Sequence, residues 1–167
     1  MRFKKMTEAD MAEYLQNLGA LEEGIRYERN ELMKQVESLE EAIERNTFRN
    51  SDGSSGLRTV ISQDTRDKVF HILQKAYRSI EQEIEQATHE LWELDKKEQK
   101  MRNVKKCLAR LPFCQREILE ELYVKGIDWQ IFAEKHAQSR ATVFRARKRA
   151  LDNLLVIYNA SYGSDKV

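Results

Sequence analysis

Apolar residues recur at intervals of seven along two stretches of the chain, and this spacing predicts two long helices. The first helix should begin at Thr7, whose hydroxyl can accept a hydrogen bond from a free amide of the first turn, and run to about residue 45. Glu8 and Asp10 lie in that turn, where the helix dipole favours negative charge. The apolar stripe consists of Met11, Leu18, Ile25, Leu32 and Leu39, with Tyr14, Leu15, Leu21, Val36 and Ile43 between them.

The second helix, from about Asp64 to Arg110, has the clearest heptad period in the chain. It is roughly 70 Å long at 1.5 Å per residue, too long to bury its stripe against a small domain. We expect it to pack antiparallel on the first helix, with Trp92 as a packing anchor. The first helix is shorter, so the uncovered part of the stripe predicts a homodimer. One row is Leu73, Ile80, Ala87, Leu94, Met101 and Leu108, and the other is Phe70, Tyr77, Ile84, Leu91, Glu98 and Lys105.

Residues 46–63, NTFRNSDGSSGLRTVISQ, interrupt the heptad pattern. The polar SDGSSG run predicts a flexible loop that no helix crosses, either disordered in part or with a short strand at LRTVIS. These glycines lack the preceding strand, the lysine and the helix start of a phosphate-binding loop, which excludes nucleotide binding.

After Pro112, which ends the second helix, the pattern changes to short helices with turn and capping residues between them. A helix over Gln115–Val124 is expected to have Ile118, Leu119, Leu122 and Tyr123 on one apolar face. Lys125 and Gly126 supply a turn, and Asp128 can cap a helix over Trp129–His136. That helix should bury Trp129, Phe132 and Ala133.

Ser139 can cap a third helix after Pro112, over Arg140–Tyr158, with a basic outer surface. Its inward positions are Val143, Ala146, Ala150, Leu151 and Leu154, and Arg140, Arg145, Arg147, Lys148 and Arg149 spread over the rest. The fold class is therefore all-α, a long antiparallel helical hairpin of coiled-coil type followed by a small helix-turn-helix domain. The expected divisions are a stalk over residues 1–110 with its loop at 46–63, a domain over 111–158, and a flexible tail over 159–167.

Composition and charge agree with exposed helices and add an asymmetry. Charged residues make up 34% of the chain, with one proline and six glycines, which argues against an all-β fold. The net charge of +1 divides into −6 over residues 1–99 and +7 over residues 100–167, so the basic end predicts a polyanionic partner. The sequence has neither a signal peptide nor a transmembrane run, and we expect a cytoplasmic protein without a membrane partner.

Residues with catalytic or metal-binding chemistry are few. Cys107 and Cys114 are spaced too widely for a CxxC pair and are expected to be buried free thiols in a reducing compartment. His71 and His89 stand alone on the second helix and are expected to be solvated or packed. The Glu-rich run EQEIEQATHELWE has no repeated carboxylate–histidine pairing and reads as a solvated face. We expect no enzymatic activity, no cofactor and no metal.

The order of capped short helix, turn and basic helix favours DNA binding. The major groove of DNA accepts one α-helix, whose first residues meet base edges while basic residues further along meet phosphates. The polar and basic residues of this helix that are expected to contact double-stranded DNA are Ser139, Arg140, Thr142, Arg145, Arg147, Lys148 and Arg149.

Residues 111–154 resemble region 4 of bacterial sigma factors, which reads the promoter −35 element. The resemblance is carried by the LP-x-x-QRE-I-L start, the Tyr-x-x-Gly turn and the S-R-x-T-V start of the basic helix. It implies base contacts from Arg140, Ala141, Phe144 and Arg145. Ala141 and Phe144 replace polar residues of the family, which implies a target other than the consensus −35 hexamer. His136, Ala137 and Gln138 replace the family's Leu-Gly-Ile in the turn.

The rest of the chain does not resemble a sigma factor, and its layout is similar to phage late-gene regulators of the ArpU and RinA type. This implies a phage or prophage transcriptional activator. The resemblance also implies RNA polymerase as a partner for Ile118, Leu119, Leu122 and Tyr123, which otherwise form the local core. Two alternatives stay open: a small-terminase-like DNA-packaging subunit that assembles into a ring, and an adaptor for RNA polymerase or sigma factor that never touches bases.

Overall fold

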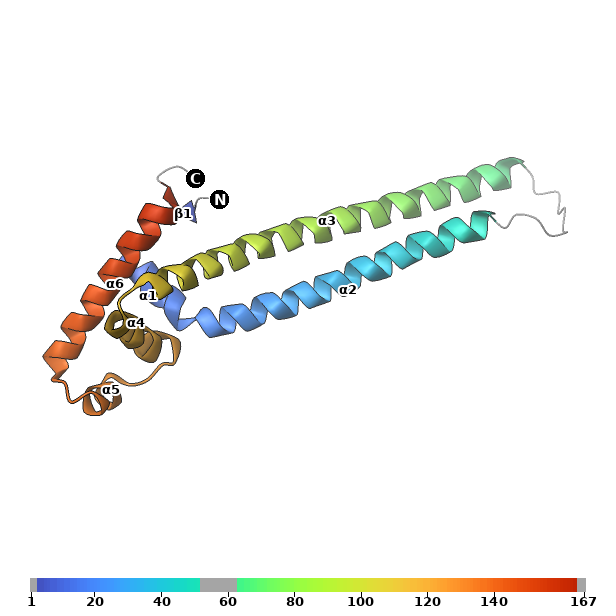
Figure 1. Cartoon of the computed structure of the whole chain (residues 1–167). Coiled ribbons are helices and arrows are strands. Elements are labelled where there is room, and N and C mark those ends of the chain that lie inside the picture. The colour runs from blue at the N-terminus through green and yellow to red at the C-terminus, as the bar shows by residue number, and fades with distance from the viewer. Residues whose placement is uncertain (1–2, 52–62, 165–167) are drawn as a thin grey trace. The chain divides into compact units, whose positions relative to one another are not determined.

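The computed structural model describes the backbone of residues 3–51 and 63–164, without the side chains of 45–67, 69, 73 and 164. Six α-helices and a π-helix dominate the described residues, which confirms the all-α class with a long helix pair (Figure 1). The elements in chain order are β1 (Phe3–Lys4), α1 (Glu8–Gln16), α2 (Leu18–Ser51), α3 (Gln63–Arg110), α4 (Phe113–Leu119), η1 (Glu120–Val124), α5 (Trp129–Lys135), α6 (Arg140–Tyr162) and β2 (Gly163–Ser164).

The chain forms two compact units that differ from the division expected after residue 110. One unit comprises residues 1–25 together with 96–167, and the other comprises 26–95. The first turns of α2 and the last turns of α3 therefore belong with the C-terminal helices. We call these the C-terminal unit and the helix-pair unit.

The N-terminal helix begins where the sequence predicts but is interrupted one residue after Gln16. Thr7 caps α1 in a capping box: its hydroxyl accepts from the Asp10 amide at 3.3 Å, and the Asp10 carboxylate accepts from the Thr7 amide at 2.9 Å. Asn17 then separates α1 from α2. Its side-chain amide donates to the Glu13 carbonyl at 3.0 Å, the kind of local side-chain bond that competes with a helix. The expectation of one continuous helix from Thr7 was wrong at this residue.

In the helix-pair unit, α2 and α3 run side by side in opposite directions (Figure 1). Ala87 and Leu94 of the predicted stripe are buried at 2% and 3% exposure, and the Arg29 guanidinium pairs with the Asp95 carboxylate across the two helices. Trp92 is 53% exposed, so the expectation that it anchors the packing was wrong. Other large apolar side chains exposed in this unit are Tyr27, Met33, Phe70 and Ile72.

The end of α2 also differs from expectation. The helix continues to Ser51 and so includes residues 46–51, for which the sequence predicts a loop. Polarity alone does not end a helix, and in this stretch no proline or glycine precedes Gly53. The expected SDGSSG loop beyond Ser51 and the alternative strand at LRTVIS lie outside the described residues.

The C-terminal unit has an apolar core that gathers helices from both ends of the sequence. Met11 and Leu15 of α1, Val104 of α3 and Leu119 of α4 are fully buried with Leu154 of α6. The Lys105 ammonium also pairs with the Glu22 carboxylate at 2.7 Å, joining the end of α3 to the start of α2. This core fixes the short helices relative to α1 and α3.

Residues 159–164 of the tail expected over 159–167 belong to α6 and β2 and contact the N-terminal residues, and residues 165–167 lie outside the described residues. The Asn159 side chain holds the Met6 backbone by two hydrogen bonds. Its Oδ1 accepts from the Met6 N–H, and its Nδ2 donates to the Met6 carbonyl oxygen, each at 3.0 Å. Phe3 and Lys4 then pair in parallel with Gly163 and Ser164. A Cβ at Gly163 would lie 2.6 Å from the Asn159 carbonyl oxygen, so this close approach requires glycine.

Within the described residues, no helix is long and apolar enough to cross a membrane.

Asn159→Ala tests the closure between the two ends of the chain. It removes both bonds to Met6 and should lower the free energy of unfolding of the C-terminal unit by about 2 kcal/mol, because each such bond contributes about 1 kcal/mol. We would measure this by denaturation followed through Trp129 fluorescence in a Trp92→Phe background. Asn30→Ala, on the exposed surface of α2, is the control. Equal stability of the two variants would contradict the closure.

Candidate nucleic-acid interface

Two capped helix starts and one glycine turn build the surface around α6. Gly126 takes a φ of +65°, a left-handed conformation that glycine adopts without steric cost. Asp128 caps α5, and its carboxylate accepts from the Gln130 amide at 2.7 Å. Both features confirm the turn and cap predicted from the sequence.

The turn between α5 and α6 is tight and slightly strained. The Ala137 φ is +50°, which costs a residue with a Cβ roughly 1 kcal/mol relative to glycine. Ser139 then caps α6, accepting from the Thr142 amide at 3.3 Å, and its hydroxyl lies 2.9 Å from that of Thr142. The hydroxyls of Ser139 and Thr142 are therefore engaged in holding the helix start.

One face of α6 is buried in the core as predicted, and the buried face is longer than expected. Val143, Ala150, Leu151 and Leu154 are exposed by 2% or less. Tyr158, which was expected to end the helix, is fully buried, and burial raises the pKa of its phenol to about 12. The basic residues of α6 are consequently directed away from the core.

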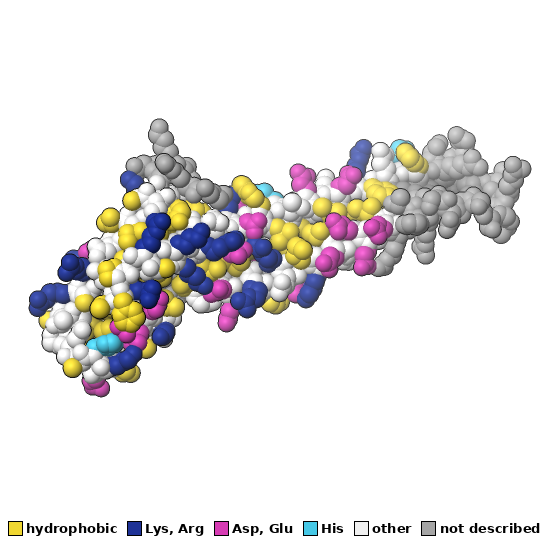
Figure 2. All heavy atoms as spheres, viewed as in Figure 1, with side chains coloured by type: hydrophobic (Ala, Val, Ile, Leu, Met, Phe, Trp, Pro, Cys, Tyr) yellow, Lys and Arg dark blue, Asp and Glu magenta, His cyan; other side chains and the backbone are white. Residues whose placement is uncertain are grey.

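The opposite face of α6 carries the expected cations. Arg140, Ala141, Arg145, Lys148 and Arg149 are exposed. Figure 2 shows Lys and Arg side chains spread over the visible face of the C-terminal unit, among apolar and acidic ones. Seven of the nine expected DNA-contacting residues are thus exposed, and two of the seven, Ser139 and Thr142, have hydroxyls engaged at the helix start.

Arginines and aromatic rings alternate beside this face. The Arg140 guanidinium lies 5.0 Å from the ring centroid of Trp129 and 5.4 Å from that of Phe144. Arg147 lies 4.8 Å from the Phe144 centroid and 5.8 Å from that of Tyr123. Phe144 is half-buried between the two arginines and 5.8 Å from the Trp129 ring. Such cation–π contacts hold the guanidinium groups near fixed positions.

A buried carboxylate behind this face was missed in the sequence. Glu121 is 6% exposed, and the Lys135 ammonium donates to its Oε1. That bond lowers the pKa of the Glu121 carboxyl, against the opposing effect of burial, and raises the pKa of Lys135. The sequence pattern gave no sign that Glu121 would be buried, because a glutamate on a short helix is expected to face solvent.

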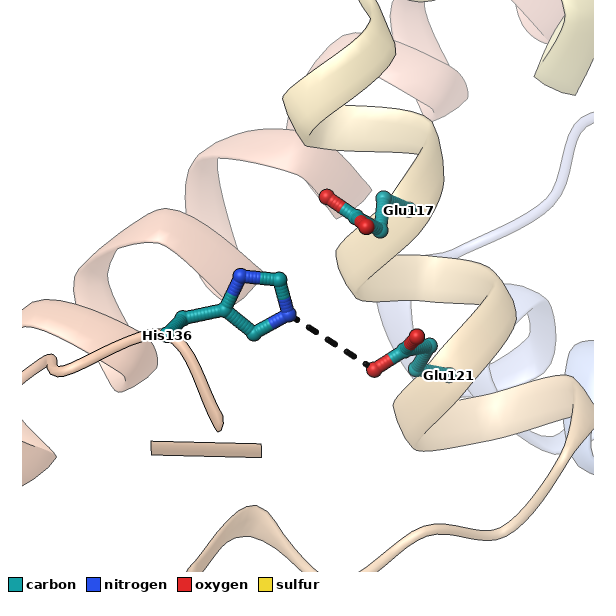
Figure 3. Close-up of side chains that lie close together, drawn as sticks. All are labelled: Glu117, Glu121 and His136. Atoms are coloured by element: carbon teal, nitrogen blue, oxygen red, sulfur yellow. Dashed lines mark ion pairs between the residues drawn. The ribbon is translucent and has the colours of Figure 1, made fainter. Parts of the chain in front are cut away.

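His136 lies on the other side of the same carboxylate (Figure 3). Its ring stacks on Phe132 with centroids 4.3 Å apart, and its Nε2 is 3.8 Å from Glu121 Oε2. The His136 position, where the resemblance has leucine, is therefore filled by a ring that combines apolar stacking with a polar edge.

A π-helical turn brings Glu121 to this position. The Lys125 amide donates to the Glu120 carbonyl, and the Ile127 amide to the Glu121 carbonyl, each at 2.9 Å. These bonds span five and six residues, so the backbone over η1 is wider than in an α-helix. The predicted helix over Gln115–Val124 instead begins at Phe113 and ends in this wider turn.

The face expected to meet RNA polymerase mainly belongs to the core. Ile118 and Leu119 are 2% and 0% exposed, whereas Leu122 and Tyr123 are half-buried and pack against the core. The two fully enclosed residues are therefore not open to a partner.

The thiols and lone histidines divide differently. Cys107 is buried as expected, but Cys114 is exposed, since it lies on the outer side of the first turn of α4. His71 and His89 are exposed on α3, each within 6.2 Å of one aromatic ring by centroid distance.

A scan against protein-family models, a search of curated proteins and a search of solved structures found no match to this chain.

Glu121→Gln tests the electrostatic part of this arrangement. The folded-state pKa of Glu121 is lowered, so its contribution to stability is present above its unfolded-state pKa and is lost as the pH falls through the folded value. The variant should be less stable than the wild type at pH 7, and the difference should shrink on acidification. Denaturation at a series of pH values measures it. Glu134→Gln, on the exposed side of α5, is the control, and a pH-independent difference would contradict the ion pair.

Proposed function

We propose that this protein is a sequence-specific DNA-binding transcriptional regulator that reads duplex DNA with α6. The observation that carries the proposal is the division of α6 into a buried apolar face and an exposed basic face that starts at the capped end of the helix. A helix held in this way presents its first turns to a groove while its own scaffold stays on the other side.

Base reading would come from the first two turns. Arg140 and Arg145 are exposed there, and arginine suits the paired acceptors O6 and N7 of guanine. Ala141, exposed between them, offers only apolar contact, such as to the methyl group of thymine. The engaged hydroxyls of Ser139 and Thr142 would leave the α6 amides and these side chains as the groups nearest the bases.

Phosphate binding would come from the cations further along the helix. Lys148 and Arg149 are exposed in its middle turns, and such contacts set the register on the duplex without reading sequence. Arg147 is half-buried beside the Phe144 ring, so we expect Phe144 to act on DNA chiefly by positioning Arg140 and Arg147. The charge of +7 over residues 100–167 supports the same polyanionic partner.

The resemblance of residues 111–154 to sigma region 4 supports a role in transcription, and the layout supports a phage or prophage activator. A half-buried Leu122 and Tyr123 leave only a small apolar edge for RNA polymerase. DNA, rather than polymerase, is therefore the first partner we propose, in the cytoplasm.

Selection from randomised duplexes tests base reading. The wild type should enrich a defined sequence, and Arg140→Ala or Arg145→Ala should each lose roughly 1 to 3 kcal/mol of discrimination at one position. Lys148→Ala should weaken binding to all sequences and reduce the salt dependence. Arg26→Ala, exposed on α2, is the control. No enriched sequence, with non-specific binding unchanged in all these variants, would reject the proposal.

The exposed apolar side chains of the helix-pair unit support a homodimer. Tyr27, Phe70 and Trp92 are 69%, 64% and 53% exposed, on helices otherwise rich in charge, and burying them against a second copy would stabilise the pair. A dimer would place two copies of α6 on two half-sites.

Light scattering after size-exclusion chromatography tests this state. The wild type should be a dimer at micromolar concentration, and Trp92→Glu should shift it toward monomer, while Gln82→Glu on the exposed surface of α3 should not. A monomeric wild type would contradict the dimer, and a ring of eight or more copies would favour the packaging alternative.

A further inference from the structure

Three potential metal ligands converge at the junction of α4, η1 and α5. Glu117 and Glu121 lie on successive turns of one helical segment, and their carboxylates face the His136 ring (Figure 3). One ligand atom from each residue lies within 4.8 Å of the other two. Glu117 and His136 are half-buried, so the cluster lies near the surface of the C-terminal unit.

Two atoms of this cluster have unmet bonding capacity. Glu121 Oε2 and His136 Nε2 are both shielded from solvent and have no hydrogen-bond partner among the described residues. Their separation of 3.8 Å is too long for a hydrogen bond between them. Leaving two such atoms unpaired in a buried place is costly, whereas an ion between them would satisfy both.

The other oxygen of Glu121 is already held. Lys135 donates to Oε1, which leaves Oε2 directed toward His136. In metal sites a ligating carboxylate is commonly fixed by such an outer partner. The nearby charges are Glu117, Glu121, Lys135 and the more distant Lys125. The two carboxylates and the two lysines balance in charge, so attraction for a dication depends on Glu117 and Glu121 lying nearer to it than the lysines do.

We propose that Glu117, Glu121 and His136 bind a divalent transition metal ion of the Zn²⁺ type. An imidazole nitrogen with two carboxylate oxygens favours Zn²⁺, Mn²⁺ or Fe²⁺ over Mg²⁺ or Ca²⁺, which prefer oxygen ligands alone. Tetrahedral Zn²⁺ with bonds of 2.0–2.1 Å requires ligand atoms about 3.3 Å apart. The ligand atoms of Glu121 and His136 are 3.8 Å apart, close to this separation, and metal binding would draw the Glu117 carboxylate in from within 4.8 Å.

A bound ion would tie the α4–η1 segment to the end of α5, immediately before the turn into α6. The strained Ala137 lies next to His136, so the ion would fix the residue from which that turn begins. Water or an atom of a bound molecule would fill the fourth coordination position, because the described residues offer three protein ligands there.

The test is Zn²⁺ binding by the full chain after dialysis against a chelator, in a Cys114→Ser background that removes the exposed thiol. Titration calorimetry should give one Zn²⁺ per chain. Glu117→Gln and His136→Gln should each raise the Kd at least about 10-fold, since even outer-partner changes cost 10- to 100-fold. Glu120→Gln and His89→Gln are the matched controls and should bind as the parent does.

Thermal unfolding gives a second readout that does not depend on the calorimetric signal. Zn²⁺ should raise the unfolding midpoint of the parent but not that of Glu117→Gln, because an ion that binds only the folded chain stabilises it. Glu117 is half-buried with no role in the core, so this variant should fold. Three results would each overturn the proposal: no saturable Zn²⁺ binding by the parent, Zn²⁺ binding by Glu117→Gln and His136→Gln as tight as by the parent, or Mg²⁺ binding by the parent as tight as Zn²⁺ binding.

Discussion

The inner face of α6 packs against α1, α4 and α5, and this contact holds the helices of the C-terminal unit around one core. Leu151, Leu154 and Tyr158 are nearly or fully enclosed, and burying each such side chain contributes roughly 1.5 to 3 kcal/mol. Because a helix is rigid, burying this face also fixes the direction in which the opposite face points. Arg140, Arg145, Lys148 and Arg149 therefore face solvent, and Arg147 is half-buried at the edge.

Two smaller features hold the ends of α6. At its C-terminal end, Asn159 bonds to the Met6 backbone, so the first residues of the chain brace the last helix. At its N-terminal end, Ser139 caps the helix and the arginines pack on Trp129 and Phe144. A side chain that is already positioned loses less conformational freedom on binding. The geometry thus favours recognition by a rigid helix over recognition by a mobile basic tail.

Local chemistry made much of this predictable. Thr7, Asp128 and Ser139 each cap a helix through an amide two or three residues away, and the heptad rows around Ala87 and Leu94 describe the packed side of α3. Features set by distant contacts were not predictable. Asn159 finds its partner 153 residues away, and the burial of Glu121 depends on Lys135 and a π-helical turn. Trp92 lies next to the heptad rows in the sequence and not in them, and its side chain is 53% exposed.

For the candidate interface, the sequence identified the helix and its cations, whereas the arrangement of the aromatic rings needed the structure. Phe144 read as a base-contacting position, yet its ring lies half-buried between Arg140 and Arg147. Helical spacing places residues 140, 144 and 147 on one side, but it does not say that Trp129 from α5 joins them. The metal-ligand cluster was missed for the same reason, because Glu121 and His136 come together only through tertiary packing.

The central claim is that the first turns of α6 lie against base edges, and site-specific photo-crosslinking tests it most directly. A photoreactive amino acid would replace Ala141, which is exposed between the proposed base-reading arginines, and a second would replace Val156, which is 67% exposed further along α6. On a selected duplex, position 141 should crosslink to bases at one fixed place and position 156 should not. Crosslinks from position 156 with none from position 141 would contradict the account.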